Sequence, residues 1–396
     1  MTLPQVRIEL KAAKRIRNFD CWIFRDELVK ADAALPAGEV VEVADPRGGF
    51  VGYGFWHPTA HIAVRVGSHA AQQPLDAGWL SQRIAEAVAR RGSIAGTNAA
   101  RLVFSEADGV PGLIVDRYAD YLVVQFRSAG LDRRRSDVVE ILQRHLHPQG
   151  ILERSDKAFR DEEGLPQVVR ILAGEVPERI LIEEAGLRFW VDPHHGAKTG
   201  FYLDQRTTRE RIRRAVQPDQ TFLDAFAFTG SLGIAAASRG ARVICLEQHE
   251  PFLALAKDNA KLNHVSDRID YVAGDAFYWL DLKANGSERV DWVSLDPPGL
   301  AKTKAELSTA RRALHHLVHR GLQMLAPDGR LLLSICSYHL LGRVEEIVRI
   351  AAEDLRLRLT VEDAWRQAED HPWILQLPAS RYLASWQFAR DARRSA

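Results

Sequence analysis

Four carboxylates stand at the ends of four successive apolar segments in the second half of the chain. They are Asp224, Glu247, Asp275 and Asp296. In a doubly wound α/β sheet, the residues that follow parallel strands meet at one edge, and ligands bind along that edge. Four negative charges gathered there would attract a ligand that carries positive charge. Each acid taken alone has another explanation, because such residues often cap a helix or form a salt bridge.

The turn at residues 226–233 argues against a dinucleotide as that ligand. Dinucleotide sites use the pattern G-x-G-x-x-G, because the pyrophosphate must approach bare backbone at a helix N-terminus. Gly230 and Gly233 match the last two glycines, but Phe228 fills the first position and would obstruct this approach. Asp224 would also repel a phosphate. S-adenosylmethionine (SAM) fits these residues better, because its sulfonium and amino groups are positively charged and it has no pyrophosphate.

We therefore predict a SAM site along this edge. Glu247 ends the second strand, where such sheets place the acid that binds a ribose diol. Asp275 and Ala276 follow the third strand and would flank an adenine ring. The predicted cofactor-binding residues are Asp224, Phe226, Thr229, Gly230, Glu247, Asp275, Ala276 and Asp296.

Two prolines and a cysteine mark the ends of the next two strands. Pro297 and Pro298 remove two backbone donors and keep the chain extended after Asp296, so this carboxylate should point out of the sheet edge. The following strand, residues 329–335, is succeeded directly by Cys336. We expect Asp296 and Cys336 to face one pocket beside the cofactor.

The chain has three cysteines, which are Cys21, Cys245 and Cys336. Their odd number and wide spacing argue against a disulfide framework and against a zinc site, so no metal is expected. Cys245 lies inside an apolar strand and is typical of a small buried residue. Cys336 follows its strand and precedes Ser337 and Tyr338, which suits a reactive thiolate. The alternative for Cys336 is also a buried structural role.

Changes of pattern along the chain divide it into three regions. Residues 1–75 contain short β-type runs separated by glycine and proline turns, which predict a small barrel-like domain. Residues 76–190 mix helices, a hairpin and further strands, as an α+β domain does. In residues 191–396 strands alternate with helices as in βαβ units, which predicts a Rossmann-like domain and an α/β protein overall.

Individual elements follow from the periodicity, and a hairpin should pair residues 113–115 with residues 121–126. Helices are predicted over residues 79–91, 136–145, 251–263 and 305–325. The length of 396 residues, with 46% hydrophobic and 27% charged residues, allows two or three cores. No apolar run is long enough to span a membrane, and the N-terminus lacks a secretory pattern. We therefore expect a cytoplasmic enzyme.

Seven segments in order resemble the PUA-domain-containing class I SAM-dependent methyltransferases that modify cytosine C5 in large-subunit ribosomal RNA. They are residues 22–24, 105–117, 153–156, 198–206, 296–298, 336–337 and 370–372. The resemblance extends over nearly the whole chain. It implies an N-terminal PUA domain that binds RNA, a middle domain that serves as a substrate platform, and large-subunit rRNA as the partner. It also implies that the last strand, residues 381–388, closes the sheet antiparallel.

The resemblance further implies a covalent mechanism. Cytosine C5 is a poor nucleophile, so the thiolate of Cys336 would first add to C6 and thereby activate C5 for methylation. Asp296 would share a proton with N3 and stabilise the charge that develops on the ring. Two-cysteine relatives place a second cysteine after the first proline of this motif, where it assists product release, and that position is Pro298 here. The base that removes the C5 hydrogen is therefore unassigned.

Further residues near the active site are predicted from the same resemblance. Gln205, Arg206 and Pro297 are predicted to bind substrate, although Arg206 could hold either an RNA phosphate or a carboxylate. His371 would either shape the pocket or stabilise a turn.

The net charge gives no global sign of nucleic-acid binding. The chain has 53 Lys and Arg residues against 52 Asp and Glu residues, for a formal net charge of +1. Contacts to RNA phosphates would therefore come from local basic patches. The candidates are Lys11, Lys14, Arg15 and Arg17; Arg133, Arg134 and Arg135; and Arg206, Arg209, Arg211, Arg213 and Arg214. The alternative is that each patch is a solvated face.

Other functions remain open. Methyltransferases for exocyclic amines also use an Asp-Pro-Pro turn, but they usually place an aromatic residue after the prolines, where this chain has Gly299. Methylation of a guanine in rRNA would leave Cys336 without a role, and methylation of a uracil is excluded only by the resemblance. A non-catalytic RNA-binding ribosome assembly factor would need neither the acids nor the thiol. A homodimer is compatible with the sequence, but no feature argues for it.

Overall fold

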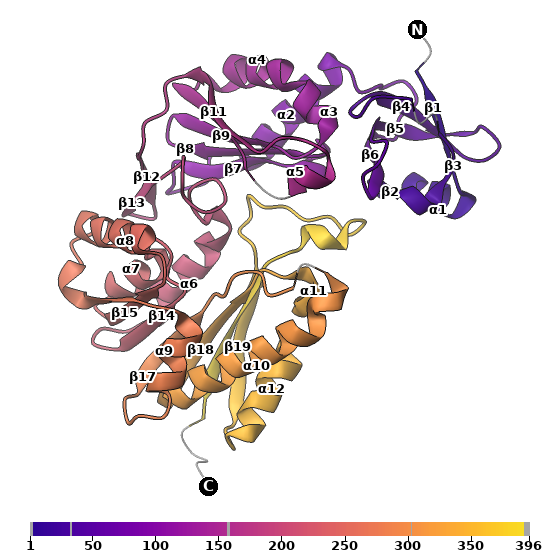
Figure 1. Ribbon diagram of the computed structural model, residues 1–396. Helices are drawn as coiled ribbons and strands as arrows, with labels where there is room; N and C mark the ends of the chain where they lie inside the picture. Colours follow the sequence, from indigo (N-terminus) through magenta and orange to yellow (C-terminus); the bar gives the residue numbers. More distant parts are fainter. Residues whose placement is uncertain (1–2, 32–33, 157–158, 302, 392–396) are drawn as a thin grey trace. The chain divides into compact units, whose positions relative to one another are not determined.

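The computed structural model describes residues 3–31, 34–156, 159–301 and 303–391, and the chain forms two compact units (Figure 1). The first unit comprises Met1–Ile182, Val191–Leu203 and Asp370–Ser380. The second unit comprises Glu183–Trp190, Asp204–Glu369 and Arg381–Ala396. The chain therefore passes between the units several times, and a segment near the C-terminus belongs to the first unit.

A six-stranded sheet forms the N-terminal part of the first unit. Its strands are β1 (Gln5–Ile8), β2 (Trp22–Phe24), β3 (Leu28–Lys30), β4 (Val40–Ala44), β5 (Phe50–Trp56) and β6 (Ile62–Ser68). They pair in the order β2-β6-β5-β4-β1-β3, and helix α1 (Leu10–Arg17) accompanies them. Val41, Trp56 and Val64 are buried in a shared core. The strand-rich N-terminal region is thus as the sequence predicts.

A five-stranded sheet forms most of the remaining first unit. Its strands are β7 (Ala99–Phe104), β8 (Leu113–Tyr118), β9 (Tyr121–Phe126), β10 (Gly150–Ser155) and β11 (Val168–Gly174), in the order β11-β10-β9-β8-β7. β8 and β9 are antiparallel, so the predicted hairpin is confirmed. The helices are α2 (Ala77–Arg91), α3 (Ala129–Arg133), α4 (Arg135–Leu146) and α5 (Phe159–Glu162). α2 and α4 confirm the helices predicted at residues 79–91 and 136–145.

Helix α2 illustrates how local sequence sets the bounds of an element. Asp76 accepts the backbone N–H of Trp79 at 2.8 Å and caps the first turn. Gly92 follows the last turn with a φ of 52°, a conformation that glycine adopts without steric cost. Between these ends, Leu80 and Ile84 are fully buried in the core of the middle sheet. Capping and one apolar face together define the helix.

A seven-stranded sheet forms the second unit, and a short hairpin of β12 (Ile180–Glu184) and β13 (Leu187–Val191) precedes it. The strands are β14 (Thr221–Ala225), β15 (Arg242–Glu247), β16 (Ile269–Ala273), β17 (Val290–Leu295), β18 (Leu325–Ile335), β19 (Leu359–Arg366) and β20 (Ala384–Arg390). Their order is β16-β15-β14-β17-β18-β20-β19, and the first five are parallel.

Helices alternate with the parallel strands of this sheet (Figure 1). They are α6 (Arg206–Ala215), α7 (Ser231–Ala237), α8 (Glu250–Leu262), α9 (Ala276–Lys283), α10 (Leu307–Met324), α11 (Tyr338–Leu341) and α12 (Val344–Asp354). α8 and α10 confirm the helices predicted at residues 251–263 and 305–325. Leu223, Val293 and Leu333, from three neighbouring strands, are fully buried in one core. The alternation confirms the predicted Rossmann-like architecture.

The end of the sheet differs from the sequence prediction. β20 is antiparallel to β18, as predicted, but it does not close the sheet. β19 pairs with the other side of β20 and is the edge strand of the sheet. The sequence analysis missed β19 because most of its side chains are exposed and Glu362 and Asp363 interrupt any apolar alternation. Charges of this kind are common on edge strands, where they discourage pairing with other chains.

The helices also bear on the membrane prediction. Within the part of the chain that the structure describes, no helix is both long and apolar enough to cross a membrane. The cytoplasmic location and the domain boundaries at residues 75 and 190 stay predictions.

Candidate cofactor site and active site

Three acids lie at the carboxyl ends of neighbouring parallel strands in the second unit. Asp224 is near the end of β14, Glu247 ends β15, and Asp296 follows β17. Because β14 pairs with both β15 and β17, the three acids share one edge of the sheet. Burial, together with the negative charges of Asp296 and Glu247, raises the pKa of Asp224 to about 7, although the Gly233 N–H opposes this rise.

The two carboxylate oxygens of Asp224 have different surroundings. The residue is 1% exposed, and its Oδ2 accepts the backbone N–H of Gly233 at 2.8 Å. Among the residues that the structure describes, its Oδ1 is buried without a hydrogen-bond partner, and so is the hydroxyl of Thr229 in the following turn. A buried charge without a partner is costly. These atoms therefore fit a ligand that brings a positively charged group, as the amino and sulfonium groups of SAM would.

The turn after β14 has a backbone conformation that residues other than glycine rarely adopt. Phe226 and Phe228 have φ angles of 69° and 51°, and Gly230 has a φ of 77°. Positive φ is strained for residues other than glycine, and such strain is concentrated at functional sites. A Cβ at Gly233 would lie 3.1 Å from Oδ2 of Asp224. The turn thus brings bare backbone close to the buried carboxylate.

Glu247 is fixed by the backbone around it. Its Oε2 accepts the N–H of Phe228 at 2.9 Å, and its Oε1 accepts the N–H of His249 at 2.8 Å. Each carboxylate oxygen can accept more than one hydrogen bond. Both oxygens therefore keep the capacity to bind the hydroxyls of a ribose, which suits the predicted role.

Asp275 displays the alternative that the sequence left open. It is the N-cap of α9, and its Oδ1 accepts the backbone N–H of Tyr278 at 2.9 Å. The residue is exposed, whereas Ala276 is buried. Helix capping accounts for one oxygen of Asp275, and the cofactor-binding roles of Asp275 and Ala276 stay predictions.

Cys336 lies directly after β18, beside the strand that Asp296 follows. β17 and β18 are paired in parallel, and Sγ of Cys336 is 3.9 Å from the carbonyl oxygen of Pro297. The cysteine is half-buried. The structure therefore brings the thiol next to the turn that holds Asp296. That the two side chains face one pocket stays a prediction.

The other two cysteines have environments that suppress the thiolate. Burial, with the charges of nearby acids, raises the pKa of Cys21 to about 12. Cys245 lies inside β15, where burial and nearby acids raise its pKa well above the usual value. Because the thiolate is the nucleophilic form, neither position suits covalent catalysis. The buried structural role predicted for Cys245 agrees with its environment.

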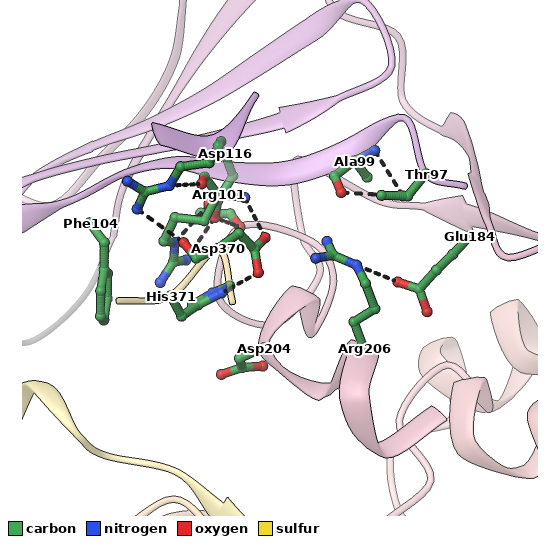
Figure 2. Close-up of polar contacts among 12 residues, drawn as sticks. Thr97, Ala99, Arg101, Phe104, Asp116, Glu184, Asp204, Arg206, Asp370 and His371 are labelled. Carbon is green, nitrogen blue, oxygen red and sulfur yellow. Dashed lines mark hydrogen bonds and ion pairs between the residues drawn. The ribbon is translucent and has the colours of Figure 1, made fainter. Parts of the chain in front are cut away.

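Gln205 contacts the candidate active site through Asp296. It is 3% exposed, and its Nε2 donates to Oδ2 of Asp296 at 2.8 Å. The next residue, Arg206, instead lies beside Glu184, with its Nε 3.4 Å from Oε2 (Figure 2). Of the two partners that the sequence left open for Arg206, the structure shows a carboxylate. The roles of Gln205, Arg206 and Pro297 in substrate binding stay predictions.

Most arginines of the three basic patches are paired within the protein. The arginines of α6 contact the carboxylates of Glu184, Asp363 and Glu210 and the backbone carbonyl of Ala185. The arginines at 133–135 contact the carboxylates of Asp132 and Glu153 and the backbone carbonyls of Ala37 and Gly38. Arg15 and Arg17 contact the carboxylates of Asp20, Glu27 and Asp45. This pairing favours a structural role over phosphate binding. Lys11 and Lys14 are exposed on α1.

Asp370 and His371 are held within the first unit (Figure 2). Nδ1 of His371 is 3.0 Å from Oδ1 of Asp370, whose Oδ2 accepts the backbone N–H of Arg101 at 2.9 Å. The imidazole also packs edge-on against Phe104, with ring centroids 5.5 Å apart. Both Asp370 and His371 are buried. These contacts favour the interpretation in which His371 stabilises a turn.

The sequence analysis missed Thr208, which donates to Gln205, and Trp365, which donates to Thr208. Thr208 is three positions further along α6, and the i, i+3 spacing of helix neighbours could have indicated it. Trp365 lies on β19, the strand that no pattern predicted. No local signal could have found this contact.

Models of two protein families match the chain. A PUA-like domain matches residues 6–69, and an S-adenosylmethionine-dependent methyltransferase matches residues 160–359, about half of the chain. The chain belongs to the SAM-dependent methyltransferase family. The predicted cofactor, the Rossmann-like domain and the PUA-like domain are therefore confirmed at this level.

Relatives of this methyltransferase match almost its full length. Proteins named ribosomal RNA large subunit methyltransferase I from Shewanella frigidimarina and Salmonella arizonae are 34% and 32% identical. Both alignments cover 96% of this chain, and they cover 98% and 96% of those proteins.

Solved structures show the same fold. A candidate methyltransferase in complex with SAH has a TM-score of 0.85 at 20% identity, and a candidate SAM-dependent methyltransferase from Streptococcus mutans has 0.83 at 19%. Each comparison covers 98% of this chain and 100% of the other chain. At such low identity, the likeness shows the fold alone.

Proposed function

We propose that this methyltransferase modifies C5 of a cytosine in large-subunit ribosomal RNA, with Cys336 as the covalent nucleophile. The position of Cys336 carries the proposal, because the half-buried thiol follows β18 and lies 3.9 Å from the carbonyl oxygen of Pro297, beside Asp296. The name of the relatives supports large-subunit rRNA as the substrate class. The motif around Asp296 and the thiol support cytosine as the base.

The proposed cofactor site uses the acids of the sheet edge. SAM supplies an electrophilic methyl group on a positively charged sulfur. Asp224 would face positive charge through its partnerless Oδ1, and Glu247 would accept the ribose hydroxyls. The remaining proposed contacts are Phe226, Thr229, Gly230, Asp275, Ala276 and Asp296. Among these, the hydroxyl of Thr229 is the buried donor that has no partner of its own.

The proposed chemistry begins and ends at one sulfur atom. The Cys336 thiolate adds to C6, which forms a C–S bond and shifts the C5–C6 double-bond pair toward C4 and N3, so that C5 becomes nucleophilic like an enamine carbon. C5 would then form the bond to the methyl carbon, and the pair of the broken S–CH3 bond would stay on the cofactor sulfur and neutralise its charge. Asp296 shares a proton with N3 and thereby stabilises the charge on the ring. After C5 has gained its methyl group, a base takes the C5 proton, the double bond re-forms, and the C6–S pair returns to sulfur. Water or Asp296 would serve as that base, because Pro298 replaces the second cysteine of related enzymes.

RNA binding is proposed for the N-terminal part of the chain. The PUA-like domain would contact rRNA, and residues 76–190 would form a platform for the substrate. Because the arginines of the basic patches are mostly paired, the exposed Lys11 and Lys14 on α1 are the better candidates for contacts to phosphates. Gln205, Arg206 and Pro297 are proposed to lie near the bound base.

Methyl transfer from labelled SAM to large-subunit rRNA, with nucleoside analysis of the product, tests the proposal. Wild type should yield 5-methylcytidine, and Cys336→Ala should yield none while still binding SAM. Cys245→Ala is the matched control and should keep activity, since this thiol is buried inside a strand. Full activity of Cys336→Ala would show that the thiol is structural. A methylated purine or 5-methyluridine as product would show that the base is wrong.

A second measurement follows the covalent bond itself. Fluorine at C5 cannot leave as a proton, so RNA that carries 5-fluorocytosine should trap the adduct after methyl transfer. We expect a denaturation-resistant complex of RNA with wild type and none with Cys336→Ala. Trapping at another residue would contradict the assignment of the nucleophile.

A further inference from the structure

A chain of three hydrogen bonds leads from β19 to the candidate active site. Nε1 of Trp365 donates to Oγ1 of Thr208 at 2.9 Å. The Thr208 hydroxyl donates to Oε1 of Gln205 at 2.6 Å, and Nε2 of Gln205 donates to Oδ2 of Asp296 at 2.8 Å. Trp365, Thr208 and Gln205 are 7%, 1% and 3% exposed. The three hydrogen-bonded side chains are thus shielded from water as far as the carboxylate of Asp296.

The indole sets the direction of the whole chain. An indole N–H can only donate, so the Thr208 hydroxyl accepts from it and has its single proton left for Gln205. The amide oxygen of Gln205 therefore faces Thr208, and its NH₂ group faces Asp296. A glutamine without these neighbours could present either end, because its oxygen and nitrogen are alike in shape. The reversed amide would place an oxygen against the Asp296 carboxylate.

The indole is itself held in place. The guanidinium of Arg211 lies over the Trp365 ring, 4.6 Å from its centroid, and the same arginine pairs with Asp363 on β19. β19 is paired along its length with β20, where Trp365 stands opposite Ser385. The chain of hydrogen bonds therefore starts from a donor whose orientation is fixed by stacking and by the sheet.

We propose that Trp365 and Thr208 are positioning residues for methyl transfer, which lock the amide of Gln205 so that it donates to Asp296 and orients this carboxylate toward the base. The inference rests on the proposed function, in which Asp296 acts on the cytosine ring. It assigns to Gln205 an orienting role instead of the predicted contact with substrate. Because the orientation of Asp296 matters for the chemical step, loss of the lock should appear in kcat and not in KM.

Thr208→Val tests the proposal, because valine keeps the shape of threonine and removes the hydroxyl. We expect kcat to fall about tenfold, as when one buried hydrogen bond is lost, with KM for RNA and for SAM unchanged. Thr208→Ser keeps the hydroxyl and should restore most of kcat. Thr207→Val makes the same change one position earlier in α6 and should leave kcat as in wild type.

Trp365→Phe is a second, independent variant, since it keeps an aromatic ring beneath Arg211 and removes the donor. It should also lower kcat. If Thr208→Val does not fold, this variant tests the proposal in its place. In the double variant the losses should be less than additive, because both changes break one chain. Wild-type kcat in the folded single variants would overturn the proposal. A loss confined to KM or to the melting temperature would overturn it as well.

Failure of the proposed function would look different. In that case wild type would yield a product other than 5-methylcytidine. The contrast between valine and serine at position 208 would still report whether the amide lock matters for the methyl transfer that does occur. A normal product with no such contrast would reject the lock alone.

Discussion

In the first unit two buried aspartates each hold an arginine, whereas in the second unit Asp224 is buried without one. Asp116 is fully buried and accepts from Arg101 through both oxygens, at 2.7 and 2.8 Å (Figure 2). Asp108 is bound by Arg91 in the same way, at 2.7 and 2.6 Å. Asp224 is 1% exposed, and its Oδ1 has no hydrogen-bond partner within the described part of the chain.

Under the proposed function, the difference separates a carboxylate that supports the fold from one that would bind the cofactor. A buried acid that meets its own arginine is neutralised within the protein, and removing either partner is what costs free energy. Asp224 instead lies near Asp296 and Glu247, whose charges add to its burial and raise its pKa. Such an arrangement is unfavourable for folding and is typical of binding sites. Equally buried aspartates therefore differ in effect: those paired with arginine stabilise the first unit, whereas Asp224 destabilises the ligand-free second unit.

The largest effect is expected from Asp116→Ala. It leaves Arg101, which is 7% exposed, as a buried cation without its carboxylate. The free energy of unfolding of the first unit should fall by about 3–5 kcal/mol. SAM affinity of the folded fraction should not change. Urea unfolding and calorimetric titration with SAM measure the two quantities. Surface substitutions change the free energy of unfolding by about 0.5 kcal/mol. A loss no larger than this would show that Asp116 does not stabilise the fold and would contradict the comparison.

Asp224→Asn should have the reverse profile. Removing the charge should weaken SAM binding by about 10- to 100-fold, the range for a hydrogen bond to a charged group. Without SAM, the melting temperature should stay the same or rise, because a buried charge has been removed. Asp270→Asn, the same change at an exposed position of β16, is the matched control and should alter neither property. A variant that loses stability but keeps its SAM affinity would place Asp224 with the structural acids.

The smallest effect is a dependence on pH. The pKa of Asp224 is raised from 3.8 to about 7 in the folded, ligand-free protein. The folded state therefore binds the proton more tightly, and the contribution of this group to stability is lost as pH rises from about 4 to about 7. A positively charged ligand favours the ionised form, so SAM binding should release a proton below pH 7.

Calorimetry in two buffers with different ionisation enthalpies measures this proton. Release should approach one proton at pH 6 and vanish above pH 8, and affinity should weaken by up to about tenfold per pH unit below 7. Asp224→Asn should abolish the release. An affinity that is independent of pH in wild type would contradict the raised pKa.

Sequence predicted the parts of the molecule whose signals are local. β14, β15 and β17 each contain a short run of buried apolar residues, as buried parallel strands do, and the acids at their ends follow from chain order. The thiol after β18 was found for the same reason. β19 was missed because an exposed edge strand lacks such a run. The row of acids at the carboxyl ends of the parallel strands could thus be predicted from sequence, but the neighbouring edge strand β19 could not.

Contacts between residues far apart in the chain could not be predicted. Arg134 is a member of a basic run in the sequence, yet its guanidinium donates to the carbonyl of Gly38. Arg211 meets Asp363, and Trp365 meets Thr208. Charge runs show where arginines are, and only the fold shows which acids and carbonyls neutralise them. The same limit explains why the predicted phosphate-binding patches are mostly internal ion pairs.

The ribosome can complete the first unit only late in synthesis, because Asp370–Ser380 belongs to it. At about 5–20 residues per second, translation from Ile182 to Asp370 takes on the order of 10–40 s. During that interval the backbone N–H of Arg101 and Nη2 of Arg91 lack the oxygens of Asp370 that they bind in the finished protein. The nascent chain therefore carries an incomplete first unit while most of the second unit is being made.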